Sequence, residues 1–182
     1  MENIHKTSAR QLTIIGIMSA FLCISGPFSI PIGIVPISLT NLAIYITIYI
    51  IGKKDGTISY LIYLLIGVVG LPVFAGFSGG FTKLAGPTGG YLIGFAFMAF
   101  ISGIFIDKFP NKIFMCFLGM LIGTIVTYTL GTVWLAYVVH LSFNKALTIG
   151  VLPFIPGDLA KMIIASLAGP QIRKRIKSAG LY

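Results

Sequence analysis

Charged residues are scarce in this sequence. They make up 9% of its 182 residues, whereas a soluble globular domain carries about 25%. So few charges cannot cover the surface of a soluble domain of this length. Hydrophobic residues account for 57% of the chain, and the mean hydropathy is +1.00. The composition therefore predicts a membrane protein.

Side chains that do chemistry are rarer still: the chain has four Asp and Glu, two His and two Cys. A membrane aspartyl protease needs two intramembrane carboxylates, and only Asp158 qualifies. A serine or metal site needs a usable histidine, but His5 is in the polar N-terminal segment and His140 stands alone. Cys23 and Cys116 lie in apolar runs, far from a second metal ligand. We therefore expect no catalytic set, no metal site and no cofactor.

A phosphate-binding loop is also missing. A Walker A motif ends in Gly-Lys-Ser or Gly-Lys-Thr, and neither occurs here. If ATP drives uphill transport by this protein, the ATPase must be another polypeptide. The net charge of +9 does not indicate binding to nucleic acid, because the basic residues flank the apolar runs.

Five uncharged runs fill most of the chain, and about twenty apolar residues suffice to cross a bilayer. The run 11–52 is broken in its middle by Gly and Pro and is long enough for two crossings. With Gly, Pro and charges as boundaries, transmembrane helices are expected near 11–30, 36–52, 57–71, 90–106, 113–139 and 146–170. The sequence thus predicts an all-α membrane protein with six transmembrane helices in a single integral membrane domain, residues 1–182.

The basic residues lie mainly on one side of the lipid bilayer when six helices are threaded alternately. That side holds ten of the thirteen: Lys6, Arg10, Lys53, Lys54, Lys108, Lys112, Arg173, Lys174, Arg175 and Lys177. The opposite side holds Lys83 and Lys145, and Lys161 lies within a span. Because cytoplasmic loops carry the excess of Lys and Arg, both termini are predicted to be cytoplasmic.

An Asp and a Lys lie together inside the sixth expected helix. Asp158 and Lys161 are three residues apart, hence on one helix face and close enough to interact. Each would cost roughly 2.5–3.5 kcal/mol at the centre of a lipid-exposed helix, so both should face a protein interior or a wet cavity. Pro156 and Gly157 indicate an outward-facing helix start, where the positive helix end favours a carboxylate. A substrate site is the favoured interpretation, and a structural ion pair is the alternative.

The connection 72–90 lies on the same outer side, and six of its residues between 76 and 90 are glycine. Irregular backbone near membrane depth occurs where it lines a cavity, and glycine lets the backbone approach a ligand closely. The connection is therefore predicted to be a lid, with glycines such as Gly79 packed against a small ligand. A plain external connector is the alternative.

Three segments together carry a resemblance to a known family: GLPVFAGFSGG (70–80), GPTGGYLIGF (86–95) and FIPGDLAK (154–161). They closely resemble the BioY family, the biotin-capturing S components of bacterial energy-coupling-factor (ECF) transporters. The resemblance implies the six-helix S-component fold, biotin as the ligand, and a place in the bacterial plasma membrane. It also implies a partner module of a transmembrane coupling (T) protein and two cytoplasmic ATPases.

The chemistry of biotin suits the residues singled out above. Biotin has a ureido ring, an apolar thioether ring and a carboxylate tail. An ionised Asp158 can accept hydrogen bonds from ureido N–H groups, and Lys161 can donate to the ureido carbonyl or to the carboxylate. Phe74 and Tyr91 are candidates to cover the ring faces, since ligand pockets are mainly apolar.

Two further assignments follow from the resemblance. The family begins its second span with a P-x-T-L-Q-like segment. This chain has Thr40 at the glutamine position, so the adjacent Asn41 is the candidate amide contact. In the family, span one contacts the coupling protein through small residues, which here are Gly16 and Ala20. Such a pair also allows internal helix packing, which is the alternative.

Three other functions stay open at this point. They are capture of a different small vitamin, a membrane enzyme, and a purely structural or partner-docking membrane protein. The missing catalytic set disfavours the enzyme.

Overall fold

The computed structural model describes residues 9–31 and 33–179. Within them the chain is mainly helical, with one short β-hairpin. The elements in chain order are α1 (Ala9–Ser25), β1 (Ser29–Ile30), β2 (Ile37–Ser38), α2 (Thr40–Val69), α3 (Phe81–Ala85), α4 (Gly89–Lys108), α5 (Ile113–Val139), α6 (Phe143–Gly150) and α7 (Ile155–Ser178). The two strands pair antiparallel, with Ser29 opposite Ser38.

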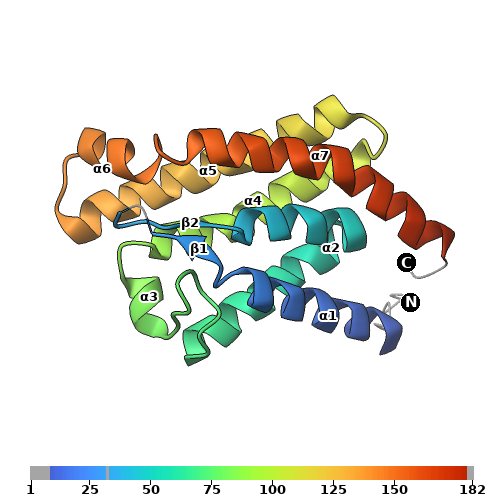
Figure 1. The fold of residues 1–182 in the computed structure, drawn as a ribbon, viewed down its shortest axis with the longest axis horizontal. Coiled ribbons are helices and arrows are strands. Elements are labelled where there is room, and N and C mark those ends of the chain that lie inside the picture. Colours follow the sequence, from blue (N-terminus) through green and yellow to red (C-terminus); the bar gives the residue numbers. More distant parts are fainter. Residues whose placement is uncertain (1–8, 32, 180–182) are drawn as a thin grey trace, which may run out of the picture.

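The long helices run along the molecule, and their connections gather at its two ends (Figure 1). The central helix is α2, which packs against α1, α4 and α7, while α4 packs against α5. Four fully buried tyrosines of α2 occupy the core: Tyr45, Tyr49, Tyr60 and Tyr63. Tyrosine suits such a place when its hydroxyl finds a partner, as Tyr60 does by donating to the Leu92 carbonyl at 2.6 Å.

Glycines let α4 and α5 approach closely. A Cβ on Gly94 would meet the Thr127 backbone at 2.8 Å, and one on Gly123 would meet the Met98 backbone at 3.1 Å. Small residues are typical of helix contacts in lipid, where no hydrophobic force drives helices together. The sequence predicted both helices to within two residues at each end.

A single residue divides α2. Gly52 has non-helical angles, φ 76° and ψ 179°, and a positive φ suits glycine. Helical backbone resumes at Lys53, so the separation between the expected spans 36–52 and 57–71 is contracted to one residue. The expected start at 36 is also wrong, because residues 37–38 form β2.

The sixth expected span, 146–170, consists of two helices. Residues 151–154 form turns, and α6 and α7 meet at an angle of 51°. Pro153 disfavours helical backbone at Leu152, which explains the break. The α7 helix then continues to Ser178, beyond the expected end.

Among the described residues, α4 and α5 are long and apolar enough to cross a membrane, and the α6–α7 pair makes a third span if it counts as one. The α1 helix is apolar but shorter, at 17 residues. Any 18-residue stretch of α2 contains Lys53, Lys54 and Asp55, the charged residues that follow its break. The three charges at this break therefore prevent α2 from forming one continuous apolar span.

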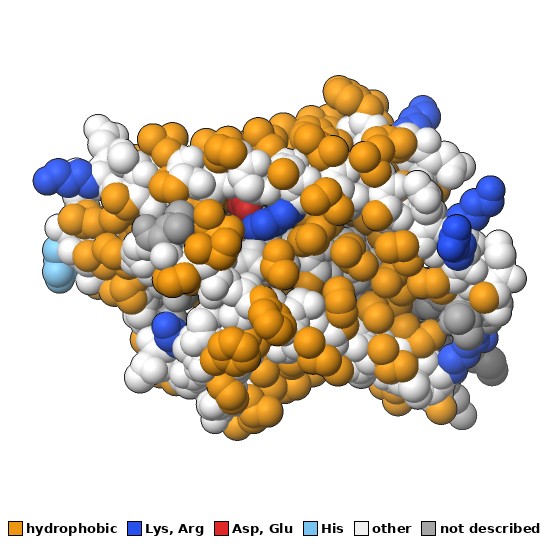
Figure 2. Space-filling model, viewed as in Figure 1, with side chains coloured by type: hydrophobic (Ala, Val, Ile, Leu, Met, Phe, Trp, Pro, Cys, Tyr) orange, Lys and Arg blue, Asp and Glu red, His pale blue; other side chains and the backbone are white. Residues whose placement is uncertain are grey.

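The surface between the two ends is largely hydrophobic (Figure 2). Large apolar side chains are freely exposed on several helices, among them Val69 (82%), Phe114 (72%) and Tyr137 (76%). Soluble monomers rarely expose contiguous apolar surface of this kind. The structure thus agrees with an integral membrane protein.

Candidate ligand-binding site

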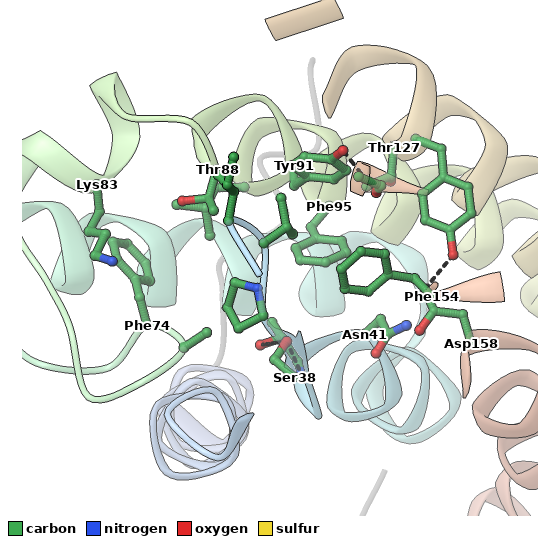
Figure 3. Close-up of a pocket in the computed structure, with 18 of the residues that line it drawn as sticks. Ser38, Asn41, Phe74, Lys83, Thr88, Tyr91, Phe95, Thr127, Phe154 and Asp158 are labelled. Carbon is green, nitrogen blue, oxygen red and sulfur yellow. Dashed lines mark hydrogen bonds between the residues drawn. The ribbon is translucent and has the colours of Figure 1, made fainter. Parts of the chain in front are cut away.

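A cavity lies beside the β-hairpin. Figure 1 shows that the hairpin is toward the end of the molecule remote from the start of α1 and the end of α7. The wall of the cavity combines apolar and aromatic side chains with a few polar and charged groups, which is the composition typical of small-molecule sites. The hairpin, the 74–78 loop and the helices α2 to α7 all contribute to its wall. Figure 3 shows aromatic side chains between Lys83 on one side of this cavity and Asp158 on the other.

Asp158 and Lys161 form the expected ion pair in this wall, with 3.0 Å between Nζ and Oδ1. Each residue is only 8% exposed. Tyr128 donates its hydroxyl proton to Asp158 Oδ2 at 2.7 Å, and Lys161 Nζ donates to the Ser38 carbonyl at 2.7 Å. A buried ion pair is tolerated when further hydrogen bonds satisfy its groups, and here both charges have them. The carboxylate also lies in the first turn of α7, at the positive end of the helix.

The pair keeps binding capacity for a ligand. A carboxylate has about four acceptor sites and an ammonium has three N–H donors. Within the described residues, each Asp158 oxygen has one partner and Lys161 uses two of its donors. The pair therefore offers an acceptor and a donor side by side. This arrangement is complementary to a ligand edge that carries an N–H next to a C=O.

The two aromatic residues indicated by the sequence both line the cavity. Tyr91 packs its ring where a side chain on Gly131 would lie, and its hydroxyl donates to the Gly150 carbonyl at 2.9 Å. Phe74 is 2% exposed and meets the Tyr63 ring edge-on at a centroid distance of 5.6 Å. Both rings are fixed by their neighbours, so this apolar wall is formed before a ligand arrives.

Asn41 also lines the cavity and is 4% exposed. Its Oδ1 accepts the Leu42 N–H at 3.1 Å, so the side-chain NH₂ is the group that it can offer a ligand. Gly79, by contrast, is not among the described residues that line the cavity. A Cβ on Gly79 would collide with the Leu71 carbonyl, so this glycine shapes the loop by close backbone packing.

Most residues that line the cavity were not assigned to a site by the sequence analysis, among them Ser38, Lys83, Tyr128 and Phe154. Ser38 and Tyr128 contact the ion pair. Lys83 comes from α3, and its place in the glycine-rich connection was the one available signal. Tyr128 lies in a long apolar helix, where nothing in the sequence distinguishes it. Within residues 9–31 and 33–179, no group of three His, Cys, Asp or Glu residues gathers as a metal site would require.

Two of the segments that line the cavity are joined to each other. The Gly76 N–H donates to the Pro27 carbonyl at 3.0 Å, and the rings of Phe28 and Phe77 meet edge to face at 5.9 Å. Gly76 and Phe77 both have positive φ, 73° and 53°, and this region is uncommon for a bulky residue. The connection 72–90, expected to have irregular backbone, also contains the short helix α3.

The small residues of α1 lie on the helix face that points away from the rest of the protein. Gly16 and Ala20 are exposed, whereas the buried residues of this helix are Ile15, Ser19 and Leu22. A Cβ on Gly16 would meet nothing within 4 Å. In the described part of the chain, the pair therefore faces away from the protein interior, which leaves it accessible to another membrane helix.

The model of the BioY family matches residues 1–178 of this sequence. The chain belongs to the BioY family. It is 39% identical over 165 residues to the biotin transporter BioY of Thermotoga maritima, covering 91% of this chain and 96% of that protein. It is 29% identical over 178 residues to the biotin transporter BioY2 of Lactococcus lactis, covering 98% of each.

A solved structure shows the same relationship at the level of the fold. The crystal structure of the S-component for biotin from an ECF-type ABC transporter matches this BioY-family chain with a TM-score of 0.83 and 35% sequence identity. The match covers 96% of this chain and 95% of the other. The fold is therefore that of an ECF S component, as the resemblance of the three segments predicted.

Proposed function

We propose that this protein is the membrane subunit that captures biotin for ATP-driven uptake by an ECF transporter. The observation that carries the proposal is the buried Asp158–Lys161 pair in the wall of an otherwise mainly apolar cavity. The family membership supports it, because relatives matched over almost their whole length are biotin transporters. The matched crystal structure is that of an S-component for biotin.

The side chains that line the cavity match the chemistry of each part of biotin. The ureido ring presents an N–H next to a C=O, which fits the acceptor and donor of Asp158 and Lys161. In this pose Lys161 meets the ureido carbonyl, one of the two roles that the sequence left open. The thioether ring then lies among aromatic walls that include Phe74 and Tyr91. Lys83 lies on the opposite side (Figure 3) and pairs with the carboxylate.

Two other expected contacts take different parts in this proposal. Asn41 offers its side-chain NH₂ to the ligand from the start of α2. Gly79 acts indirectly, because its close packing against Leu71 shapes the loop that carries Phe74. We assign the connection 72–90 to a lid, since Phe74 and Lys83 in it line the cavity and Phe77 meets the ring of Phe28.

Six membrane crossings with both termini cytoplasmic are part of the proposal, as are a single domain of residues 1–182 and a place in the bacterial plasma membrane. The six apolar segments are α1, the two halves of α2, α4, α5 and the α6–α7 pair (Figure 1). The end with Ala9 and Ser178 holds most of the described basic residues: Arg10, Lys53, Lys54, Lys108, Lys112, Arg173, Lys174 and Arg175. Lys6 and the side chain of Lys177 lie outside the described residues.

The proposal includes a T protein and two ATPases as partners, because the chain has no phosphate-binding loop of its own. The exposed face of α1 supports this assignment. Gly16 and Ala20 leave an exposed strip of small residues on a helix that is otherwise apolar, and such strips let a second membrane helix approach closely.

The deciding experiment is binding of tritiated biotin to the purified protein in lipid nanodiscs. Saturable binding that excess unlabelled biotin displaces supports the proposal. Saturable binding of labelled riboflavin or thiamine, with no binding of biotin, would assign the S component to another vitamin. Absence of binding to all three would contradict capture and favour a structural role.

A further inference from the structure

The Asp158 carboxylate is held from two helices. Lys161, three residues away on α7, binds Oδ1 and moves with the same helix. Tyr128 binds Oδ2 from α5, at the short distance of 2.7 Å, which is typical of an O–H bond to a charged oxygen. Among the described residues, Tyr128 is thus the partner that fixes the carboxylate relative to the rest of the bundle.

The hydroxyl of Tyr128 is itself well positioned. Its ring packs against a buried cluster that includes Val35, Tyr91, Leu135 and Phe154. The terminal torsion of Asp is soft, so the plane of a carboxylate is set mainly by its partners. A fixed phenol on one oxygen and an ammonium on the other define that plane.

We propose that Tyr128 is a positioning residue that sets ligand selectivity, by orienting Asp158 so that the Asp158–Lys161 pair presents one acceptor and one donor toward the cavity. This inference rests on the proposed function, since biotin supplies the matching N–H and C=O edge. Without the hydroxyl, a buried Oδ2 loses its donor, which is costly. Lys161 already binds this carboxylate, and without the hydroxyl its ammonium turns further toward Asp158. The Lys161 N–H that should donate to the ligand carbonyl is then no longer available.

The consequence concerns selectivity as well as affinity. A wild-type site rejects an analogue with a methylated ureido nitrogen, because the oriented Asp158 acceptor then has no partner. Without the Tyr128 hydroxyl, the Asp158 carboxylate can rotate away from the methylated nitrogen. The methylated analogue therefore loses less affinity relative to biotin than it does in the wild type. The ratio of the two dissociation constants therefore reports on orientation, and a general loss of packing leaves that ratio unchanged.

The test compares Tyr128→Phe with the wild type, with biotin and N-methylated biotin as ligands. Tyr137→Phe is the matched control, since Tyr137 is on the same helix and 76% exposed. We expect Tyr128→Phe to weaken biotin binding about tenfold and to lower the preference for biotin over the methylated analogue by a similar factor. The control should change neither quantity and should unfold at the wild-type temperature. Tyr128→Phe should unfold at a somewhat lower temperature without ligand, because the buried Oδ2 loses its donor, so the preference between the two ligands is the deciding readout.

A double-mutant cycle with Asp158→Asn gives the second readout. If Tyr128 acts through the carboxylate, its substitution costs much less in the Asp158→Asn background. Wild-type affinity in Tyr128→Phe, or an unchanged preference between the two ligands, overturns the inference while leaving biotin capture intact. A lowered unfolding temperature with unchanged preference assigns Tyr128 a purely structural role. Failure of the wild type to bind biotin overturns both proposals.

Discussion

The Asp107 carboxylate, at the end of α4, accepts the backbone N–H of Lys53 at 2.7 Å, directly after Gly52 interrupts α2. The second half of α2 is thus capped by a side chain from another helix, which satisfies an N–H that has no partner within its own helix. Arg173 on α7 pairs with the same carboxylate at 2.7 Å. One acidic side chain therefore joins three helices at this end of the molecule.

Removal of this carboxylate should destabilise the fold. We expect Asp107→Ala to lower the free energy of unfolding by about 1 kcal/mol through loss of the cap. The ion pair with Arg173 adds little, since the Asp107 side chain is 36% exposed. Asp107→Asn keeps an acceptor for Lys53 and should lose less. Thermal unfolding in detergent provides the measurement, with the exposed Lys54→Ala as control, and equal stability of all variants would contradict the capping role.

The ion pair of the cavity is expected to carry affinity. Asp158→Asn and Lys161→Ala should each weaken biotin binding more than tenfold, because loss of a charged partner in a buried site costs more than about 1.4 kcal/mol. Titration with tritiated biotin measures this effect, and gel filtration checks that the variants stay folded. Wild-type affinity in both variants would make the pair structural.

Lys83 should recognise the carboxylate tail and not the ring. Because this side chain is more exposed than the ion pair, we expect Lys83→Ala to weaken biotin binding only about fivefold, or roughly 1 kcal/mol. Lys83→Ala should not change the binding of biotin methyl ester, which has no charge on the tail. Lys145→Ala is the control, as another cation of the same end. Equal losses for acid and ester would place Lys83 elsewhere in the site.

The edge-to-face contact between the rings of Phe28 and Phe77 should slow the dissociation of bound biotin. Phe77→Ala removes the ring contact at 5.9 Å, so we expect faster dissociation of preloaded ligand. Phe81→Ala is a close control, because the two side chains are 65% and 66% exposed and no ring contact holds Phe81 among the described residues. Hydrogen exchange at residues 74–78 should also slow when biotin binds. If biotin dissociates at the same rate from both variants, the contact between Phe28 and Phe77 has no role in retaining the ligand.

Local features of the sequence were sufficient for part of this structure. The α4 and α5 helices were predicted because charges bound apolar runs of membrane length. The Asp158–Lys161 pair was predicted because a spacing of three puts both on one helix face. The S-component fold came from three specific segments and was confirmed by the match to a solved structure.

Contacts between distant residues explain what the sequence analysis missed. The one-residue break at Gly52 is stabilised by a carboxylate 54 positions after Lys53, and Tyr128 precedes Asp158 by 30 positions. Neither helical periodicity nor composition reports such pairings. The bend between α6 and α7 has a local cause, Pro153, but a proline in an apolar run also occurs within continuous membrane helices.

Capture and energised uptake should be separable at Gly16 and Ala20. Both lie on the exposed face of α1, and a side chain on Gly16 would contact nothing in this chain. Replacing both with Leu should therefore leave biotin binding by the isolated protein unchanged. A neighbouring helix, however, would be held away by the branched side chains, so assembly with the coupling protein and ATP-dependent uptake should fall.

Copurification of the complex and uptake of labelled biotin by cells measure these steps, with Thr148→Leu, an exposed position on α6, as control. Normal uptake by the double variant would remove α1 from the coupling surface, whereas lost binding would show that the pair supports the fold of the subunit itself.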